Sequence, residues 1–219
     1  SNTSGRTRKL SVTGYVEWTL GESRPRSAPH IVTQAASVPG GCGVLANNFY
    51  GDNGGDRTAF FAVSGNDCSL TGDRREFIGR NGSLHAPSAM KLLRLSGKTG
   101  AGQDPCGAVQ SAVKLIDGDQ RTFIFILGAA ENHARAQEAL AHYMNEDAVR
   151  QALNRVHIHW HNMLDKIVVN TPDTSVNLLV NGWLMYQTVA CRLMARSGYY
   201  QSGGAFGFRD QLQDTMALS

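Results

Sequence analysis

The sequence contains no block of lysine or arginine and no long apolar run, and each absence excludes a class of protein. Its 21 basic and 18 acidic residues are spread along 219 positions and give a net charge of only +3. Because nucleic-acid-binding proteins usually carry a basic patch, we expect no nucleic-acid partner. No apolar run approaches the roughly 18 residues of a membrane helix, and Ser1 to Arg8 contain no signal-peptide core. The chain is therefore expected to be soluble.

Cysteine is sparse. The four cysteines, Cys42, Cys68, Cys106 and Cys191, are widely separated. They lack the paired spacing of a zinc site and the density of a disulfide scaffold. We therefore expect reduced thiols in a cytosolic setting and no metal site.

What the first half does contain is a series of short apolar runs between glycine-rich turns, which is typical of antiparallel strands in a sandwich. We expect strands at 9–20, 30–37, 43–48, 57–63, 108–115 and 121–127. The last two are predicted to form a hairpin within a meander, because Gly118 between them tolerates a positive φ. The stretch 69–103 has few periodic apolar positions, and loops of that length are usually functional or disordered.

After Gly128 the apolar residues follow helical spacing, which predicts helices at 129–143, 146–166 and 172–196. Thr171 is the expected N-cap of the third helix, with Pro172 at its first position. That helix is apolar around most of its circumference, so we expect it to be buried in a larger assembly. The pattern predicts an α+β chain: an antiparallel β-sandwich (1–128), a helical linker (129–170) and the first helices of an α domain (171–219).

The densest group of candidate binding residues lies in the glycine-rich run 199–214. Glycines let the backbone approach a ligand, the aromatic residues offer stacking faces, and the polar side chains offer paired donors and acceptors for hydroxyls. The polar residues in question are Arg209, Asp210, Gln213 and Asp214. This mixture suits a sugar. The alternative is that Arg209 pairs with Asp210 or Asp214 merely to order the start of a helix.

Within this run, Tyr-Gln-Ser-Gly-Gly-Ala-Phe-Gly-Phe-Arg-Asp-Gln-Leu-Gln-Asp (200–214) resembles the segment that opens the catalytic barrel in glycoside hydrolase family 94. Members include cellobiose and chitobiose phosphorylases and the C-terminal part of cyclic β-1,2-glucan synthases. The residues of this segment are most similar to the last group. Further segments match in the same order, at 13–18, 72–74, 77–82, 100–106 and 171–173. Together they cover nearly the whole chain.

The resemblance implies a large β-sandwich, a helical linker and an (α/α)6 barrel, of which this chain would hold only the first helices. In this family an aspartic acid protonates the glycosidic oxygen while inorganic phosphate attacks the anomeric carbon from the opposite face, with inversion. The acid is expected beyond Ser219, so no catalytic residue is assigned, and the chain alone is expected to be inactive. The resemblance places Arg209, Asp210, Gln213 and Asp214 in the donor-sugar subsite. It implies no cofactor other than phosphate as co-substrate.

Two more groups of residues are candidates. In family members a loop of the sandwich can reach an active site, so Arg80 and Asn81 in the loop 72–82 are expected to contribute; the alternative is a solvated surface loop. His157, His159 and His161 surround Trp160, and two of them share a helix face as metal ligands can. No companion glutamate follows, so we expect packing instead. Cys106 is expected to be a buried thiol rather than a nucleophile.

Two hypotheses of function remain. In the first, the chain belongs to the phosphorylase-like region of a bacterial cyclic β-1,2-glucan synthase-like protein and acts on β-1,2-glucan by phosphorolysis or chain-length control. In the second, it is a non-catalytic carbohydrate-binding or structural module. Expected partners are a β-glucan or oligosaccharide, the rest of a longer polypeptide, and a second copy in a homodimer. The longer protein is expected at the cytoplasmic side of the bacterial inner membrane, as part of a larger membrane protein.

Overall fold

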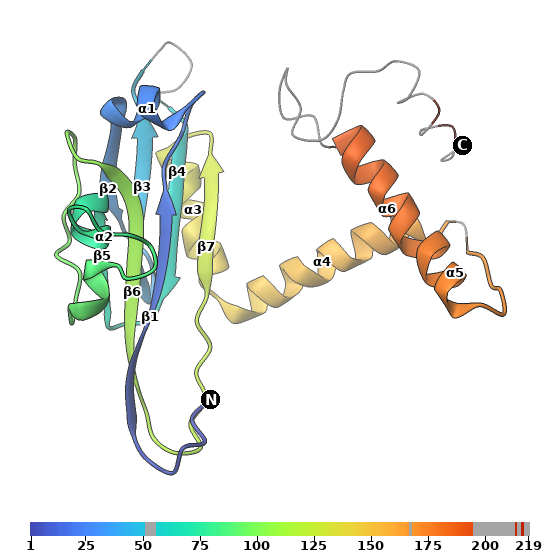
Figure 1. Ribbon diagram of the computed structural model, residues 1–219, viewed down its shortest axis with the longest axis horizontal. Helices are drawn as coiled ribbons and strands as arrows, with labels where there is room; N and C mark the ends of the chain where they lie inside the picture. Colours follow the sequence, from blue (N-terminus) through green and yellow to red (C-terminus); the bar gives the residue numbers. More distant parts are fainter. Residues whose placement is uncertain (51–55, 167, 195–212, 214–215, 217–219) are drawn as a thin grey trace. The chain divides into compact units, whose positions relative to one another are not determined.

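The computed structural model describes residues 1–50, 56–166 and 168–194, together with 213 and 216 (Figure 1). The chain divides into two compact units, Ser1–Arg150 and Gln151–Ser219. All strands of the described residues lie in the first unit.

The first unit contains two antiparallel sheets. The smaller has the strand order β1-β6-β5, and the larger has the order β2-β3-β4-β7. The strands are β1 Arg8–Glu17, β2 Ile31–Ala36, β3 Gly41–Asn48, β4 Thr58–Ser64, β5 Cys68–Asp73, β6 Pro105–Leu115 and β7 Phe125–Ala130. The predicted antiparallel sandwich is confirmed, and each predicted strand is present with shifted ends.

A core of apolar side chains joins the two sheets. Val44 and Phe61 enter it from the larger sheet, and Leu70 and Val109 from the smaller one. Gly14 of β1 lies against this core, since a Cβ there would stand 2.6 Å from the tip of the Phe61 ring. A side chain at this position would therefore push the sheets apart.

The outer face of the larger sheet is covered by α3 (His133–Tyr143). Phe60 points away from the central core and clusters with Ala136 and Leu140 of this helix. Both faces of β4 are thus buried. A strand in that position reads as a continuous apolar run, which explains why residues 58–63 do not alternate between polar and apolar.

The outer face of the smaller sheet carries α2 (Arg74–Ile78) and η2 (Ser88–Lys91). The buried residues of this layer are Phe77, Ile78, Ala89, Leu95, Cys106 and Ala108. The stretch 69–103, predicted as one long loop, therefore contains a strand and two short helical segments. Elements this short do not complete enough turns to show a period in the sequence.

The predicted hairpin around Gly118 is wrong. Gly118 has the expected positive φ of 85°, but β6 pairs with β1 and β5, whereas β7 pairs with β4 in the other sheet. A turn signal fixes a reversal of the chain and does not specify which strands pair afterwards. The segment after Gly118 crosses between sheets, so the predicted meander is wrong for β6 and β7, whereas β2, β3 and β4 do pair in sequence order.

Two of the cysteines depart from expectation. Cys42 of β3 and Cys68 of β5 form a disulfide that links the two sheets, so the prediction of reduced thiols is wrong for this pair. The pair lies 26 residues apart in sequence and meets only through the fold. Cys106 is free and buried, as predicted. Burial raises the pKa of Cys106 to about 12, so its thiol stays protonated and cannot act as a nucleophile.

The remaining helices of the first unit and the connection out of it are α1 Arg24–Ser27, η1 Ala28–His30 and α4 Glu146–Leu164. The helices predicted at 129–143 and 146–166 are confirmed as α3 and α4, although α3 begins later because Ala129 and Ala130 end β7. Among the described residues, no helix is both long and apolar enough to cross a membrane.

The helix predicted at 172–196 is a series of α-helical and π-helical segments. They are α5 Thr174–Leu178, η3 Leu179–Leu184, α6 Met185–Thr188 and η4 Val189–Met194. The prediction of Thr171 as N-cap is wrong: Asp173 caps α5, and its carboxylate accepts a hydrogen bond of 2.8 Å from the Ser175 amide. The Thr171 hydroxyl instead bonds the Asn177 side chain at 2.8 Å, and Pro172 precedes the helix.

Candidate functional site

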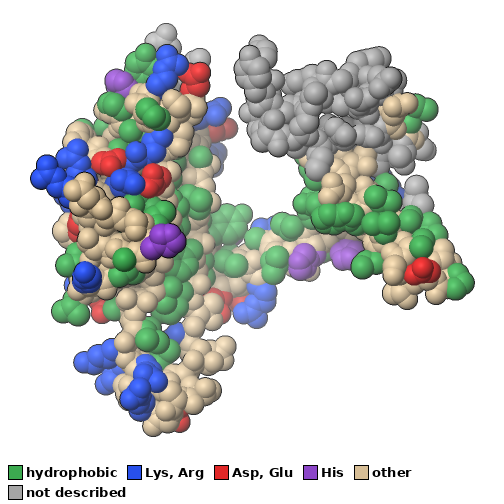
Figure 2. Space-filling model, in the orientation of Figure 1, with side chains coloured by type: hydrophobic (Ala, Val, Ile, Leu, Met, Phe, Trp, Pro, Cys, Tyr) green, Lys and Arg blue, Asp and Glu red, His purple; other side chains and the backbone are tan. Residues whose placement is uncertain are grey.

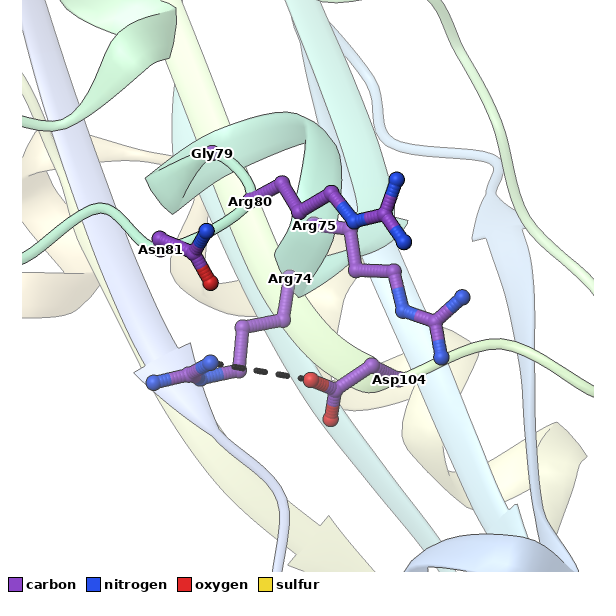
Figure 3. Close-up of a pocket in the computed structure, with 6 residues that line it drawn as sticks. All are labelled: Arg74, Arg75, Gly79, Arg80, Asn81 and Asp104. Carbon is purple, nitrogen blue, oxygen red and sulfur yellow. Dashed lines mark ion pairs between the residues drawn. The ribbon is translucent and has the colours of Figure 1, made fainter.

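A cavity of about 610 Å³ opens beside α2 in the sandwich unit (Figure 3). It is lined by Arg74, Arg75, Gly79, Arg80, Asn81 and Asp104. Figure 2 shows Lys and Arg side chains gathered with Asp and Glu over the part of the sandwich where Figure 1 places α2. Three arginines and one aspartate line the cavity, so its lining is cationic.

The short helix α2 holds these arginines in place. Its N-cap Asp73 is buried, accepts a hydrogen bond of 3.0 Å from the Arg75 amide and pairs with Lys98. The carboxylate of Glu76 accepts hydrogen bonds from the Thr71 hydroxyl at 2.6 Å and the Ser96 amide at 2.8 Å. Capping and side-chain bonds of this kind allow a helix of little more than one turn to form.

The turn that ends α2 contains two residues with positive φ, a conformation that suits the residue types found there. Gly79 has a φ of 94° and Asn81 a φ of 69°. Glycine tolerates this region freely, and asparagine is among the few other residues that enter it readily. Phe77 is buried, and its ring stacks on Tyr15 of β1 at 4.5 Å. The turn thus presents Arg80 and Asn81 from a fixed base.

An ion-pair network adjoins the cavity through Arg74 and Asp104, which both line it. The Glu17 carboxylate accepts hydrogen bonds from the Arg74 Nε and the Tyr15 hydroxyl, each at 2.8 Å, and lies 3.2 Å from the Arg24 Nε. Asp104 pairs with Arg24 and lies 3.6 Å from the Arg74 Nη1. Arg24 and Arg74 therefore each bridge the same two carboxylates. The dashed line in Figure 3 marks the pair between Arg74 and Asp104.

This network shifts two pKa values. Burial acts to raise the pKa of Glu17, but hydrogen bonds from Arg74 and Tyr15 and the charges of Arg74 and Arg24 outweigh it and hold that pKa below its usual value. Burial, and then the hydrogen bond to Glu17, raise the pKa of Tyr15 well above its ordinary range. Glu17 is therefore ionised and Tyr15 protonated at neutral pH.

Replacing Glu17 with glutamine should lower the free energy of unfolding by about 1–2 kcal/mol at neutral pH, because charge-assisted bonds to a partly exposed carboxylate are lost. The loss should depend on pH with a definite sign. A carboxyl with a depressed folded pKa stabilises fully above its unfolded pKa, near 4.5, and stops stabilising as the pH falls through the folded pKa. Urea unfolding at several pH values checks this, and the gap between the wild type and Glu17→Gln should close under acid.

Glu138→Gln is the matched control for that series. Glu138 pairs with Arg135 at 2.7 Å, but both side chains are mostly exposed. An exposed pair contributes little, so the control should change stability by less than about 0.5 kcal/mol at any pH. An equal effect of the two substitutions would show that the network around Glu17 has no special role in stability.

Arg75 and Arg80 remain available for a ligand. Neither has an acidic partner within the part of the chain that the structure describes. In Figure 3 their guanidinium groups extend toward the same side of α2. A planar guanidinium can grip two adjacent hydroxyls of a sugar, or the oxygens of a phosphate or carboxylate, through parallel hydrogen bonds. The site is thus suited to a polar ligand rich in oxygen.

The structure describes some of the predicted site residues and not others. Arg80 and Asn81 both line the cavity, whose position no sequence argument supplied. Arg209, Asp210 and Asp214 lie outside the described residues, and their role stays a prediction. Gln213 is helical and exposed. Sequence reasoning missed the network of Glu17, Arg24 and Asp104, because its members are distant in sequence and each looks like an ordinary surface charge.

The histidine cluster of α4 does not form a metal site among the described residues, which contain no group of three or more potential ligands. The predicted packing holds for Trp160, whose ring contacts Tyr186 at 5.0 Å. It is wrong for His157, His159 and His161, which are exposed. His161 instead lies 3.0 Å from the Asp165 carboxylate, one helical turn away.

Comparison with known proteins identifies two domains of one glycosyl hydrolase family in this chain. The model of the glycosyl hydrolase 94 supersandwich domain matches residues 1–146, and the model of the glycosyl hydrolase 94 superfamily catalytic domain matches residues 159–219. The first match alone covers most of the chain. The chain belongs to the glycosyl hydrolase 94 family.

Its relatives are glucan synthases and phosphorylases. The chain is 39% identical, over 99% of its length and 8% of the relative's, to the cyclic beta-(1,2)-glucan synthase NdvB of Rhizobium meliloti. It is 26% identical, over 99% of its length and 28% of the relative's, to the N,N'-diacetylchitobiose phosphorylase of Vibrio furnissii. It is 27% identical to the solabiose phosphorylase of Paenibacillus borealis, over 73% of its length and 20% of the relative's. The chain thus spans less than a third of each of these relatives.

Proposed function

We propose that the chain is part of the glycoside phosphorylase-like region of a bacterial cyclic β-1,2-glucan synthase-like protein, and that the cavity beside α2 binds a saccharide. One observation carries this. Arg74 and Asp104, from the family-like segments 72–74 and 100–106, line this cavity, and Glu17 from the family-like segment 13–18 pairs with Arg74. A shared ligand would explain why segments that are far apart in sequence and resemble the family meet through these residues.

The proposed reaction is inverting phosphorolysis of β-1,2-linked glucan, with inorganic phosphate as co-substrate and control of chain length as its purpose. Phosphate is already anionic, so such a reaction needs a general acid but no second carboxylate as base. None of the described residues is assigned as that acid. The segment 171–219, within the match to the catalytic-domain model, is proposed to form the first helices of an (α/α)6 barrel, in a protein at the cytoplasmic side of the inner membrane. The match to the catalytic-domain model supports the first of these proposals, and the second rests on the resemblance to cyclic glucan synthases.

Substituting Arg80 tests the role of the cavity. In the longer protein, Arg80→Ala should raise the KM for β-1,2-glucan about 10-fold, because one charge-assisted hydrogen-bonding group is removed from a partly solvated site. Arg80→Lys should recover only part of the loss, since an ammonium cannot grip two hydroxyls in one plane. Steady-state phosphorolysis, followed by release of sugar 1-phosphate, measures both.

Arg121→Ala is the control, because Arg121 is exposed and does not line the cavity. Equal KM values for Arg80→Ala and the wild type would support the alternative, in which the loop 72–82 is a solvated surface loop without a role in binding. The rival hypothesis of a binding module makes a different prediction. Glucan binding by calorimetry would then fall with Arg80→Ala while the longer protein showed no phosphate-dependent release of sugar at all.

A further inference from the structure

A second cavity, of about 760 Å³, lies on the sandwich unit where β1 begins and β6 ends, beside η2 and the chain that follows it. Its lining includes Lys9, Lys91 and Lys114, and within the described part of the chain none of these lysines has an acidic partner. Lys9 and Lys114 are directly opposite each other in the antiparallel pairing of β1 and β6. Like charges in opposed positions lie about 5 Å apart at Cβ and destabilise a sheet.

An apolar surface adjoins these lysines. Met90 is 48% exposed, Leu92 46% and Leu93 93%, and all three line the same cavity. Transfer of leucine and methionine side chains out of water is favourable. Three neighbouring side chains this exposed could therefore contribute to the binding free energy of a partner that covers them. Among the residues that the structure describes, this lining contains no aromatic side chain, which distinguishes the surface from a typical sugar-stacking site.

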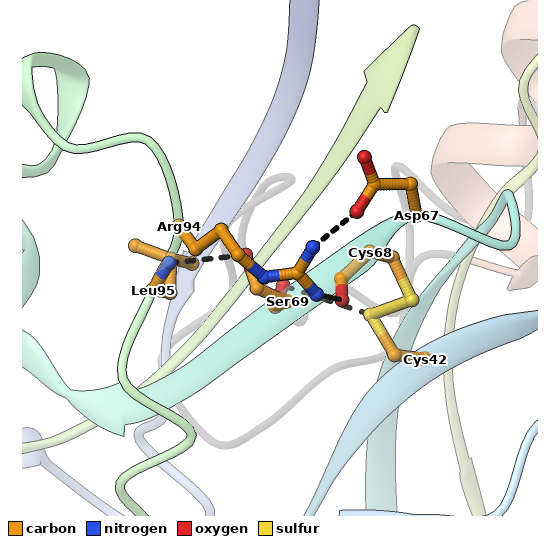
Figure 4. The surroundings of a disulfide bond; sticks show 6 residues. All are labelled: Cys42, Asp67, Cys68, Ser69, Arg94 and Leu95. Carbon is orange, nitrogen blue, oxygen red and sulfur yellow. Dashed lines mark hydrogen bonds and ion pairs between the residues drawn. A yellow bond between two sulfur atoms is a disulfide. The ribbon is translucent and has the colours of Figure 1, made fainter.

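The exposed segment is held firmly from below. Ala89 and Leu95, on either side of it, are buried. Arg94 pairs with Asp67 and donates a hydrogen bond of 2.7 Å to the Cys68 carbonyl, while the Leu95 amide donates one of 3.0 Å to the Ser69 hydroxyl (Figure 4). The apolar side chains are thus fixed outward by their neighbours, so binding there would cost little ordering of the backbone.

We propose that this basic-apolar face (Lys9, Lys91, Lys114, Met90, Leu92 and Leu93) binds the surface of a membrane that contains anionic phospholipids. Unpaired lysines attract anionic headgroups, and protruding leucines enter the boundary between headgroups and acyl chains. The exposure of Leu93 favours a lipid surface over an acidic polypeptide as the partner. Its side chain protrudes almost wholly into solvent, whereas a site for a polypeptide would have a recess that receives the partner's side chain. This contact is peripheral, and the saccharide cavity beside α2 plays no part in it.

Sedimentation of the 219-residue chain with lipid vesicles tests the proposal. The chain should bind vesicles that contain phosphatidylglycerol and should not bind pure phosphatidylcholine, and added salt should weaken the binding. Lys9→Gln combined with Lys114→Gln should lower the partition coefficient about 5-fold for each lysine. Leu93→Ser, which leaves the charge unchanged, should lower it about 10-fold. All these positions are exposed, and unchanged melting curves would confirm intact folds.

Arg57→Gln, combined with Arg121→Gln, is the matched control. It removes the same charge from exposed residues outside the basic-apolar face and should leave binding within 2-fold, as an approximate limit set by weak long-range attraction. Three outcomes would overturn the proposal. They are no binding to anionic vesicles at low salt, an equal loss with the control pair, and full binding by Leu93→Ser. The last, together with displacement from vesicles by polyglutamate, would identify an acidic polypeptide as the partner.

Discussion

Replacing Arg209 with alanine in the longer protein to which we propose this chain belongs should raise the KM for β-1,2-glucan roughly 10- to 100-fold. The resemblance places Arg209 in the donor-sugar subsite, where a guanidinium would hold two hydroxyls of the terminal glucose. The KM for phosphate should stay within about 2-fold, because the lost interaction is with the sugar alone. Steady-state kinetics with each substrate varied in turn separates the two effects.

Conservative and distant substitutions sharpen that test. Arg209→Lys keeps the charge but loses the planar fork, so it should fall between the wild type and Arg209→Ala. Arg155→Ala serves as the control, since Arg155 is an exposed residue of α4 without an acidic partner among the described residues. Unchanged KM values for both substrates would remove Arg209 from the subsite and leave the alternative, in which it only orders the start of a helix.

The strands were predictable because they depend on local patterns, whereas their pairing was not. Apolar runs bounded by glycine identified every strand except β5, whose sequence Cys-Ser-Leu-Thr-Gly-Asp contains few apolar residues and whose pairing is irregular between Thr71 and Asp73. Pairing depends on which apolar faces meet in space, and the turn at Gly118 carries no information on that. The disulfide between Cys42 and Cys68 was missed for the same reason, since only the stacking of the two sheets brings these residues together.

The candidate site was predictable in its composition and not in its geometry. The loop with Arg80 and Asn81 was identified by its density of charge and by its resemblance to the family. The adjoining ion-pair network of Glu17, Arg24 and Asp104 was not, although Glu17 and Asp104 belong to two other family-like segments. Matched segments point to a common site only once the fold shows which of them meet, and a sequence alone does not give that.

The helical segments α5 to η4 expose a row of large apolar side chains. Leu179 is 47% exposed, Trp183 55% and Tyr186 41%. Trp183 and Tyr186 stack with ring centroids 6.3 Å apart, and Trp160 adds a third ring at 5.0 Å from Tyr186. Such aromatic clusters are the usual anchors of protein interfaces, where they bury much area with little loss of side-chain entropy. We propose that this row mediates the homodimer expected from the sequence, and its exposure supports that proposal.

Trp183→Glu should therefore dissociate a dimer of the 219-residue chain. Burying a carboxylate where an indole had packed should weaken the dimer by roughly 2–4 kcal/mol, which raises its Kd about 30- to 1,000-fold. Light scattering over a concentration series should show a dimer for the wild type and a monomer for the variant. Thr174→Glu adds the same charge to the start of α5, outside the aromatic cluster, and should leave the dimer intact. A wild-type chain that stays monomeric at high micromolar concentration would show that self-association does not cover this surface.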